Sequence, residues 1–326
     1  MKLPHSLLES PFFLFDNAVD LVAALGAEIS IGEIAEIERL SKIGLPPIIS
    51  RDSLAVMLGL NPGLLWSFEK RPHRYYRHFT IKKGNGVRHI YAPKVAIKII
   101  QKWCSVHFSR AFEAPTHVFG FVPGRSHLQA ASIHLGASWV FSCDIRDFFP
   151  STTENLVFQS LISLGYTEQS ASYIRKFLCF NGALAQGSPA SPVVSNLAFR
   201  KVDELLSEIL NGYNARLSRY ADDIVFSGTG EFPEGLPVAM GQLFGDLPWK
   251  LAPEKTEMAI SPQRLKVHGL LVHGDRIRLT KGYRNRIRAY NHLLDAQKIR
   301  KDDLRRVRGH VLFAKQVADY DTRSLS

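Results

Sequence analysis

The stretch from Leu217 to Ser227 constrains the fold of this chain more than any other part of the sequence. It is apolar and rich in strand-forming residues, but Ala221, Asp222 and Asp223 interrupt it near its middle. Two adjacent carboxylates repel each other and are costly inside a buried strand, so the pattern predicts a hairpin with the acids at its turn. A solvated turn is the simpler interpretation of such a pair. Apolar strands on both sides would hold the carboxylates rigidly, and rigid carboxylates suit hard divalent cations such as Mg2+.

A second acidic residue strengthens the metal hypothesis. Asp144 follows the short apolar run Trp139–Cys143, where the alternative is an aspartate that simply ends a strand. Brought beside Asp222, Asp144 would complete a site for two cations, which activate an attacking hydroxyl and stabilise a leaving pyrophosphate. Phosphoryl transfer requires little else from the protein than positioning and compensation of charge.

A loop of small residues and prolines is the third element. Residues 186–192 read Gln-Gly-Ser-Pro-Ala-Ser-Pro and lead into a predicted helix from Pro192 to Leu210. A loop with proline at a helix start is common and needs no function. The functional alternative is a backbone that approaches a nucleotide and template closely, with Gly187 avoiding a side-chain clash.

The remaining sequence mixes helices and strands without regular alternation. The first ~60 residues are helical in pattern, and the residues from Lys281 onward are helical and basic. Further predicted elements are hairpins over Tyr75–Ile81 with Val87–Tyr91 and over Val267–Val272 with Arg276–Leu279, and helices over Val95–Phe108, Thr153–Leu164 and Glu168–Phe180. This order favours an α+β fold over a doubly wound sheet.

Charge is unevenly distributed along the chain. The whole sequence contains 41 Lys and Arg against 30 Asp and Glu, a net charge of +11. Residues 1–50 contain three basic and seven acidic residues, whereas residues 271–326 contain fourteen basic and six acidic residues. The C-terminal end is therefore where we expect a polyanionic partner to bind.

Cysteine usage and hydropathy indicate a cytoplasmic protein without a membrane partner. The three cysteines are widely spaced and form no CxxC pair, which argues against a disulfide framework or a structural zinc site. The N-terminal residues make a poor signal peptide because Pro4, Glu9 and Pro11 interrupt the apolar run. Residues 177–199 lack charged side chains, but their Gln, Asn, Ser and Pro content makes them too polar for a membrane span.

Three motifs in a fixed order resemble the palm motifs of reverse transcriptases. They are the run Asp144–Ser151 (DIRDFFPS), residues 186–192 (QGSPASP) and residues 219–223 (RYADD). The spacing also fits, with about forty residues between the first two and about thirty-five to the third. Four flanking segments extend the resemblance, so that it covers roughly residues 70–280. They are residues 75–93, similar to the fingers hairpin of bacterial retron and group II-type enzymes, and residues 119–126, 253–256 and 267–270.

The resemblance implies a right-hand polymerase of the α+β class. Its expected parts are a helical N-terminal extension at 1–65, fingers at 66–140, a palm at 141–262 with finger elements around 151–185, and a basic helical thumb at 263–326.

The resemblance also implies roles for individual residues. Asp144 and Asp222 would be the main ligands of two Mg2+ ions, for which Mn2+ can substitute, with Asp223 assisting. The backbone carbonyl of Ile145 would help to hold the metal-bound triphosphate. The ring of Phe149 would lie under the incoming sugar and exclude a ribose 2′-hydroxyl, although a core phenylalanine is the alternative.

The expected substrate-binding residues lie outside the acidic motifs. Arg88 would contact the triphosphate, and Lys82 or Lys83 would add positive charge unless these lysines are merely solvated. Gln186 and Gly187 would lie near the incoming nucleotide, and Lys255 is a candidate proton donor to pyrophosphate. Thumb arginines would bind the backbone of an RNA–DNA duplex, or else form a solvated helix surface: Arg284, Arg286, Arg288, Arg305, Arg306 and Arg308.

Two subgroup signatures of retron enzymes, NAxxH and VTG, are only partly retained. The matching positions are residues 130–134 (AASIH) and residues 267–269 (VHG). His134, Val267 and Gly269 are retained, whereas Ala130 and His268 replace the Asn and the Thr. The subgroup therefore remains open.

The resulting hypothesis is a retron reverse transcriptase that copies a cognate structured noncoding RNA with dNTPs. The family resemblance implies priming from a 2′-hydroxyl of that RNA, which gives a branched RNA–DNA (msDNA), and antiphage defence together with a separate effector protein. The alternatives are another defence-associated or group II intron-like reverse transcriptase, and an RNA-binding scaffold with incidental polymerase activity.

Overall fold

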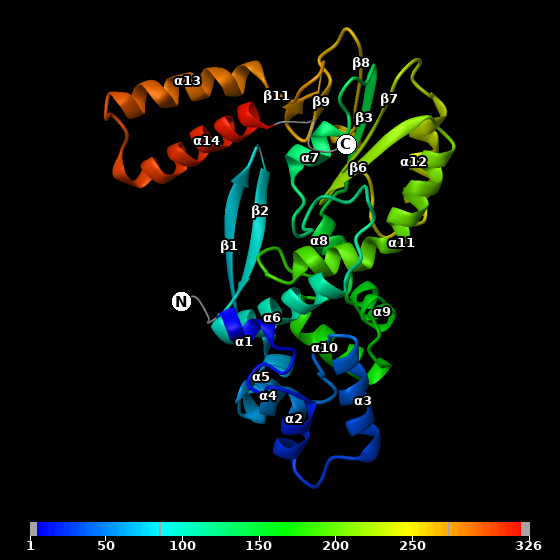
Figure 1. Ribbon diagram of the computed structural model, residues 1–326, viewed down its shortest axis with the longest axis vertical. Coiled ribbons are helices and arrows are strands. Elements are labelled where there is room, and N and C mark those ends of the chain that lie inside the picture. The colour runs from blue at the N-terminus through cyan, green and yellow to red at the C-terminus, as the bar shows by residue number, and fades with distance from the viewer. Residues whose placement is uncertain (1–4, 85, 273, 321–326) are drawn as a thin grey trace. The chain divides into compact units, whose positions relative to one another are not determined.

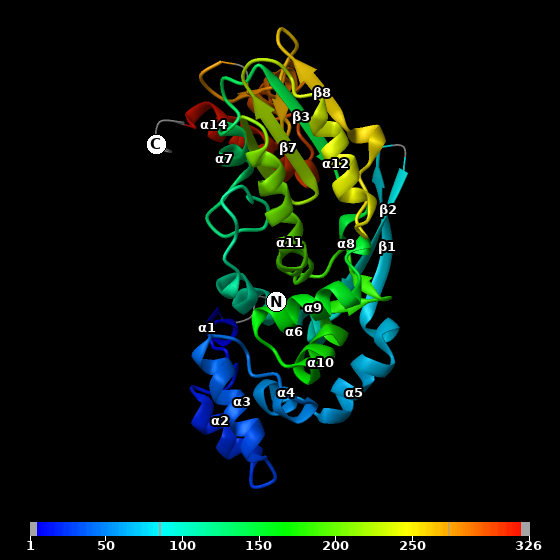
Figure 2. The ribbon, with the colours of Figure 1, turned by 90° about the vertical axis from the view of Figure 1, so that its right-hand side faces the viewer.

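The computed structural model describes residues 5–84, 86–272 and 274–320. The chain forms two compact units, each of which is assembled from two stretches of sequence. The first unit contains residues 1–114 and 147–201, and the second contains residues 115–146 and 202–326. Figures 1 and 2 show the elements of both units in two views.

The first unit is mostly helical and carries one long hairpin. Its helices are α1 (His5–Glu9), α2 (Ala18–Leu25), α3 (Ile31–Lys42), α4 (Arg51–Leu58), α5 (Pro62–Lys70), a 3-10 turn (Pro72–Tyr75), α6 (Val95–Ala111), α8 (Phe148–Ser151), α9 (Glu154–Leu164), α10 (Glu168–Leu178) and the first part of α11 (Ser191–Asn211). Its strands are β1 (Tyr76–Lys83), β2 (Gly86–Pro93), β4 (Cys179–Phe180) and β5 (Ala183–Leu184).

Polar side chains define where the N-terminal helices begin. Asn17, Ser30, Ser50 and Asn61 each accept a hydrogen bond from a backbone N–H in the first turn of the helix that follows. At α3 the cap is reciprocal, because the Glu33 carboxylate accepts from the Ser30 N–H. Such caps satisfy N–H groups that have no partner within the helix. The predicted helical pattern of the first ~60 residues is therefore confirmed over residues 5–60.

Helix α6 lies in the core of the first unit. Its Ile100, Trp103 and Phe108 side chains are buried in one cluster with residues of the N-terminal helices and of α9 and α10. Gln101 is fully buried on the same helix and makes three hydrogen bonds. It donates to the Tyr76 hydroxyl and the Phe177 carbonyl, and it accepts from the Ser188 hydroxyl. A buried amide satisfied in this way ties the hairpin, α10 and the 186–192 loop to one point of the core.

The second unit is built on a four-stranded antiparallel sheet. Its strands are β3 (Trp139–Asp144), β6 (Ala215–Tyr220), β7 (Asp223–Gly228) and β8 (Glu257–Ile260), in the order β6-β7-β3-β8. The central pair, β3 and β7, is buried on both faces, which explains why these strands are continuously apolar in sequence.

A smaller sheet and several helices complete the second unit. The small sheet contains β9 (Lys266–Val267), β10 (Leu270–Leu271) and β11 (Arg278–Leu279), in the order β11-β10-β9. The helices are α7 (His127–Ser132), α12 (Gly235–Gly245), α13 (Lys281–Asp295), α14 (Lys301–Asp319) and the second part of α11. Figure 1 shows α13 and α14 side by side. Buried residues of β3, β7, α7 and the small sheet share one apolar cluster.

Most predicted elements are confirmed, with three differences. Asp223 is not in the turn but begins β7. The helix predicted to reach Phe180 ends at Leu178, because the chain continues as β4 and pairs with β5. The predicted C-terminal hairpin is a three-stranded sheet, since residues 266–271 already fold back on themselves before β11 pairs with β10.

The mixture of helices and antiparallel strands confirms the predicted α+β class. The predicted boundaries of fingers, palm and thumb stay predictions. In the described part of the chain, no helix combines the length and the apolar character that crossing a lipid bilayer requires.

Candidate active site

The three predicted acids lie at one end of the β3–β7 strand pair. Asp144, the last residue of β3, pairs directly with Asp223, the first residue of β7. Asp222 lies in the tight turn between β6 and β7, and its carbonyl accepts a hydrogen bond from the Ile145 N–H (2.9 Å). Facing residues of an antiparallel pair have neighbouring side chains, so the register brings together carboxylates that are 79 positions apart in sequence.

The backbone of Phe119 and Gly120 packs closely against the turn that carries Asp222. The N–H groups of Phe119 and Gly120 donate to the Arg219 carbonyl at 2.8 and 3.3 Å. A Cβ at position 120 would lie 2.2 Å from the Ala221 nitrogen, far inside van der Waals contact. Ala221 itself has a positive φ of 59°, which only a tightly held turn imposes on alanine. Glycine at position 120 is therefore required by the close approach of two backbones.

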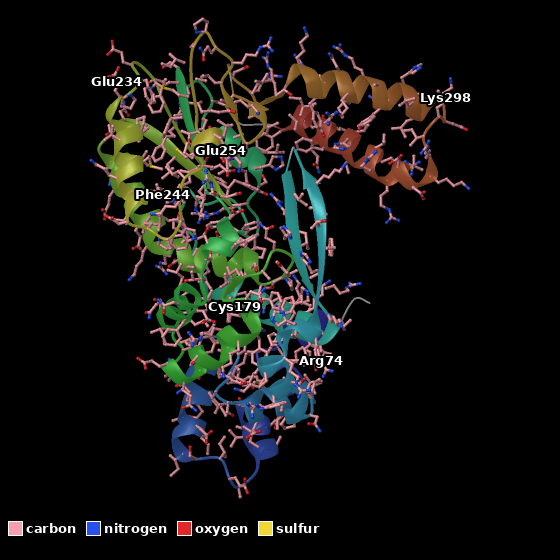
Figure 3. The ribbon with its side chains drawn as sticks, turned by 180° about the vertical axis from the view of Figure 1, so that it is seen from behind. Arg74, Cys179, Glu234, Phe244, Glu254 and Lys298 are labelled. Atoms are coloured by element: carbon pink, nitrogen blue, oxygen red, sulfur yellow. The ribbon has the colours of Figure 1, made fainter. Side chains whose placement is uncertain are left out.

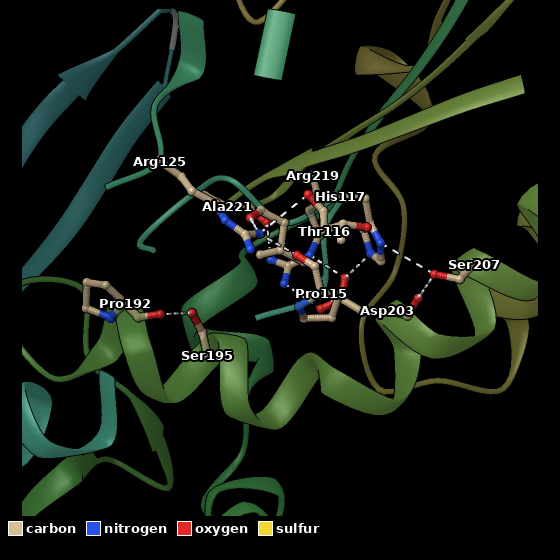
Figure 4. A network of polar contacts seen from close by, with 11 residues as sticks. Pro115, Thr116, His117, Arg125, Pro192, Ser195, Asp203, Ser207, Arg219 and Ala221 are labelled. Atoms are coloured by element: carbon tan, nitrogen blue, oxygen red, sulfur yellow. Dashed lines mark hydrogen bonds and ion pairs between the residues drawn. The ribbon is translucent and has the colours of Figure 1, made fainter. Parts of the chain in front are cut away.

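A buried ion pair also fixes this turn (Figure 4). The Arg219 guanidinium donates to both carboxylate oxygens of Asp203, from Nε to Oδ1 at 2.7 Å and from Nη2 to Oδ2 at 2.6 Å. Both side chains are fully buried. Its third nitrogen, Nη1, donates to the Ala221 carbonyl at 3.0 Å. Because a guanidinium is planar and rigid, fixing two of its nitrogens on Asp203 also fixes the carbonyl next to Asp222.

Two side chains provide the counter-charge and hydrogen bonds to the acids. The Lys255 ammonium forms an ion pair with Asp144, and both side chains are partly exposed. Lys255 ends the short 3-10 helix Pro253–Lys255, which is held there because the Ala252 N–H just before it donates to the Asp144 carbonyl (2.8 Å). His268 lies 2.8 Å from Asp223, between Nδ1 and Oδ2.

The Cys143 thiol, next to Asp144, is fully buried. Its burial, together with the nearby Asp223 charge, raises its pKa to about 12. The thiol is therefore neutral at physiological pH and adds no charge to the site.

The predicted residues of the 186–192 loop lie beside the β1–β2 hairpin within the first unit. The Gln186 carbonyl accepts a hydrogen bond from the Tyr91 N–H of β2 (2.7 Å). Gly187 has a φ of 120°, and a Cβ there would lie 2.9 Å from the Tyr91 carbonyl oxygen. Glycine is thus required at this position by a contact within the protein itself.

The hairpin side chains and Phe149 are accessible to different degrees. Lys82 is exposed, and Arg88 pairs with Ile81 across the hairpin and is half-buried. In α8, Phe148 is the core residue, whereas Phe149 is half-buried. Of these two adjacent rings, the ring of Phe149 is therefore the one that a ligand can contact.

The predicted thumb arginines lie on α13 and α14 of the second unit. Arg284, Arg286 and Arg288 on α13 are exposed, as are Arg305, Arg306 and Arg308 on α14. The two helices pack through Tyr283, whose hydroxyl is 2.7 Å from His310 Nδ1. Figure 3 shows nitrogen-tipped side chains along both helices and Lys298 at the connection between them.

A family comparison decides what this arrangement belongs to. Residues 81–272 match the family model described as reverse transcriptase (RNA-dependent DNA polymerase). The chain belongs to the reverse transcriptase family. The predicted right-hand polymerase class and the predicted enzyme class, RNA-directed DNA polymerase, are thereby confirmed.

Curated relatives of this reverse transcriptase are retron enzymes. It is 28% identical to retron Ec86 reverse transcriptase of Escherichia coli, over 88% of this chain and 90% of that protein. It is 29% identical to retron Mx65 reverse transcriptase of Myxococcus xanthus, over 84% of this chain and 68% of that protein. Among solved structures, telomerase from Candida albicans in complex with a telomeric RNA fragment matches 64% of this chain and 46% of that chain, with a TM-score of 0.45 and 10% identity.

The acids of this reverse transcriptase have the chemistry of a divalent-cation site, but they do not form a closed set of ligands. In the described residues, no group of three or more His, Cys, Asp or Glu side chains is arranged to hold a metal ion. Asp144 and Asp223 instead contact Lys255 and His268. Three carboxylates at adjacent strand ends offer the oxygen donors that hard cations require, so the donor set fits such an ion. A cation at Asp144 would take over the charge compensation that Lys255 now provides.

Sequence reasoning missed two residues of this reverse transcriptase site. Asp203 was not singled out, although an arginine within an apolar strand already signals that a buried acid must pair with it. His268 was noted only as a departure from a subgroup signature. Its contact with Asp223, 45 positions away, depends on tertiary packing that leaves no local pattern.

Proposed function

We propose that this reverse transcriptase is the polymerase of a retron and copies part of a structured noncoding RNA into DNA. The observation that carries the proposal is the similarity to retron enzymes over most of the chain and nearly all of the Ec86 relative. The proposed parts are an N-terminal extension (1–65), fingers (66–140), a palm (141–262, with finger elements around 151–185) and a basic thumb (263–326).

In the proposed mechanism, Asp144, Asp222 and Asp223 would hold two Mg2+ ions, or Mn2+ in their place. The ions, when bound, activate the primer hydroxyl and stabilise the charge of the leaving pyrophosphate. The Ile145 carbonyl helps to hold the triphosphate. With a cation at Asp144, the Lys255 ammonium would be released from this ion pair and would donate a proton to the pyrophosphate. The ion pair with Asp144 supports this role, because it places the Lys255 ammonium beside the acids.

The remaining proposed contacts select and position the substrate. Arg88 and Lys82 neutralise the triphosphate, and the ring of Phe149 excludes a ribose 2′-hydroxyl. Gln186 and Gly187 border the incoming nucleotide. The exposed arginines of α13 and α14 bind the phosphates of the RNA–DNA duplex, which such helices recognise by shape and charge more than by sequence.

The proposal extends to the product and its biological use. By analogy with the retron relatives, priming starts from a 2′-hydroxyl of the RNA and gives a branched RNA–DNA (msDNA) that acts with an effector protein in phage defence. Replacement of the signature Asn and Thr by Ala130 and His268 favours a second candidate, a reverse transcriptase of another defence-associated or intron-like class.

One experiment separates these possibilities. The chain is expressed with its flanking genomic sequence, and co-purified nucleic acid is sequenced before and after treatment with a debranching enzyme. A covalent RNA–DNA species that is sensitive to debranching is expected. Linear DNA alone would favour the second candidate.

The polymerase assignment has its own test. Replacing Asp222 and Asp223 together with Ala should abolish dNTP incorporation, a loss of at least about 10³-fold, because the cations lose two ligands. RNA binding, measured in parallel, should be largely retained. Primer extension by this double variant would contradict the metal-site assignment, whereas an inactive wild type that binds RNA would favour the scaffold alternative.

A further inference from the structure

A chain of side-chain hydrogen bonds leads from Asp223 into the core of the second unit. His268 Nδ1 lies 2.8 Å from Asp223 Oδ2, and His268 Nε2 lies 3.0 Å from the Ser218 hydroxyl. The same hydroxyl lies 2.7 Å from His134 Nε2, and His134 Nδ1 lies 2.7 Å from the Ser227 hydroxyl. We call this set of five residues the histidine relay.

The relay is buried except at its Asp223 end. Ser218, Ser227 and His134 are fully buried, and the His268 side chain is 4% exposed. Burial, together with the nearby His268 and Arg216, holds the pKa of His134 well below its ordinary value, so this ring is neutral. The inner part of the relay therefore contains an uncharged, fully buried histidine with both ring nitrogens hydrogen-bonded.

When each imidazole carries one proton, a single direction of hydrogen bonding satisfies every member. An ionised carboxylate only accepts, so His268 Nδ1–H must donate to Asp223. His268 Nε2 then accepts from the Ser218 hydroxyl, which in turn accepts from His134 Nε2–H. His134 Nδ1 finally accepts from the Ser227 hydroxyl. Each group fixes the proton position of the next, and the last donor in the series points at Asp223.

The backbone holds His268 in place for this contact. His268 and Gly269 form the two-residue turn between β9 and β10, with φ of 47° and 84°. Two consecutive positive φ values are typical of a type I′ hairpin turn, whose geometry is rigid. Histidine tolerates this left-handed conformation better than most residues with a side chain. The imidazole thus reaches Asp223 from a short turn with little freedom.

We propose that His268 is a positioning residue for Asp223, and that the relay through Ser218 and His134 orients the carboxylate for the catalytic cation. A carboxylate is rigid and planar, so holding Oδ2 also sets the position of Oδ1, the oxygen that remains to bind a metal ion. The inference rests on the proposed role of Asp223 as a ligand. It also gives a physical meaning to the departure from the VTG signature, because the two ring nitrogens of His268 contact Ser218 and Asp223 at the same time.

The relay can be tested with a pair of variants that both tolerate the turn. His268→Gly keeps the positive φ and removes the imidazole. His268→Asn keeps the positive φ and places an amide donor near the position of Nδ1. The full-length chain, bound to an RNA template and DNA primer, is titrated with Mn2+ and followed by electron paramagnetic resonance. Primer extension gives kcat and the dNTP KM.

We expect His268→Gly to weaken Mn2+ binding by about 10-fold, the usual effect of losing a group that orients a metal ligand. Its kcat should fall by a similar factor while the dNTP KM stays unchanged. His268→Asn should restore Mn2+ affinity to within about threefold of wild type, because the donor to Asp223 is kept. The Mn2+ affinity of Ser218→Ala should lie between those of His268→Gly and His268→Asn, because His268 then loses the hydrogen-bond partner that fixes its tautomer.

The outcomes separate the relay from the proposed function. If the wild type extends a primer and His268→Gly matches it in Mn2+ affinity and kcat, the relay is wrong and the polymerase assignment stands. If His268→Asn is as impaired as His268→Gly, the donor role is overturned. If the wild type extends no primer, the proposed function fails, and the Mn2+ titration of the same variants then decides the relay by itself.

Discussion

Two ion pairs support the acidic end of the central sheet in different ways. Arg219 and Asp203 are both 0% exposed and are joined by two parallel hydrogen bonds. Lys255 and Asp144 are 39% and 21% exposed and meet through a single ammonium. A buried pair cannot be exchanged for water without a large penalty, whereas an exposed pair exchanges readily. The buried pair is suited to hold the turn in shape, and the exposed pair is suited to yield when a cation arrives.

The largest effect should come from breaking the buried pair. Arg219→Met leaves the Asp203 carboxylate buried without its main partner, which should lower the free energy of unfolding by about 3–5 kcal/mol. Urea denaturation followed by circular dichroism measures the change. Arg306→Gln is the matched control, because it breaks an exposed pair with Asp303 of the same unit and should cost less than about 1 kcal/mol.

A double variant sharpens this result. Replacing Arg219 with Met and Asp203 with Leu together removes both charges, so most of the stability lost in Arg219→Met should return. Polymerase activity should not return, because the hydrogen bond from Arg219 to the Ala221 carbonyl is still missing. A double variant that is active would show that the pair serves stability alone.

The next largest effect concerns the backbone contact behind the same turn. Gly120→Ala places a methyl group against the Ala221 nitrogen, which should cost about 1–3 kcal/mol and displace Asp222. Thermal unfolding and primer extension measure the two effects. Gly32→Ala in α3 is the control, because a Cβ there meets nothing within 4 Å and should stabilise the helix by about 0.5–1 kcal/mol. If Gly120→Ala and Gly32→Ala had the same thermal stability and the same primer-extension activity, the close contact between Gly120 and Ala221 would be contradicted.

Breaking the exposed pair of Lys255 and Asp144 should affect stability less and should change cation binding instead. Lys255→Gln should change the free energy of unfolding by less than about 1 kcal/mol. Because its ammonium no longer competes for Asp144, Mn2+ should bind up to about fivefold more tightly in the absence of dNTP. The kcat should fall, since Lys255 is the proposed proton donor. A loss of stability as large as that of Arg219→Met would invalidate the comparison between the two pairs.

The thumb arginines should affect stability least. Replacing Arg305, Arg306 and Arg308 with Gln should leave the unfolding transition unchanged and weaken duplex binding. The slope of log affinity against log salt should fall by about 0.7–0.9 for each phosphate contact that is lost. Fluorescence anisotropy over a salt series measures it, with Lys42→Gln on the N-terminal helix α3 as the control. An unchanged slope would favour the solvated-surface interpretation.

Sequence reasoning recovered those parts of the site that have local patterns. The acid-bearing hairpin was predicted because buried strands are largely apolar on both sides of a polar turn, and Asp144 was predicted because it ends an apolar run. The position of Asp223 at the start of β7 was not predicted, because a shift of one residue in register decides whether a side chain belongs to a turn or to a strand. The three-stranded arrangement of residues 266–279 was missed because a turn of His268 and Gly269 inside a short apolar run resembles a continuous strand.

The sequence by itself determined most of the local elements, the family and the placement of the acids at strand ends and a turn, because these depend on residue type and short-range spacing. Only the tertiary structure decided which groups hold those acids. The partners of Asp144 and Asp223 lie 111 and 45 positions away in sequence, and the relay joins residues 84 and 93 positions apart. Contacts of this range are set by strand register and chain reversals, which follow from packing of the whole unit and leave no local pattern to detect.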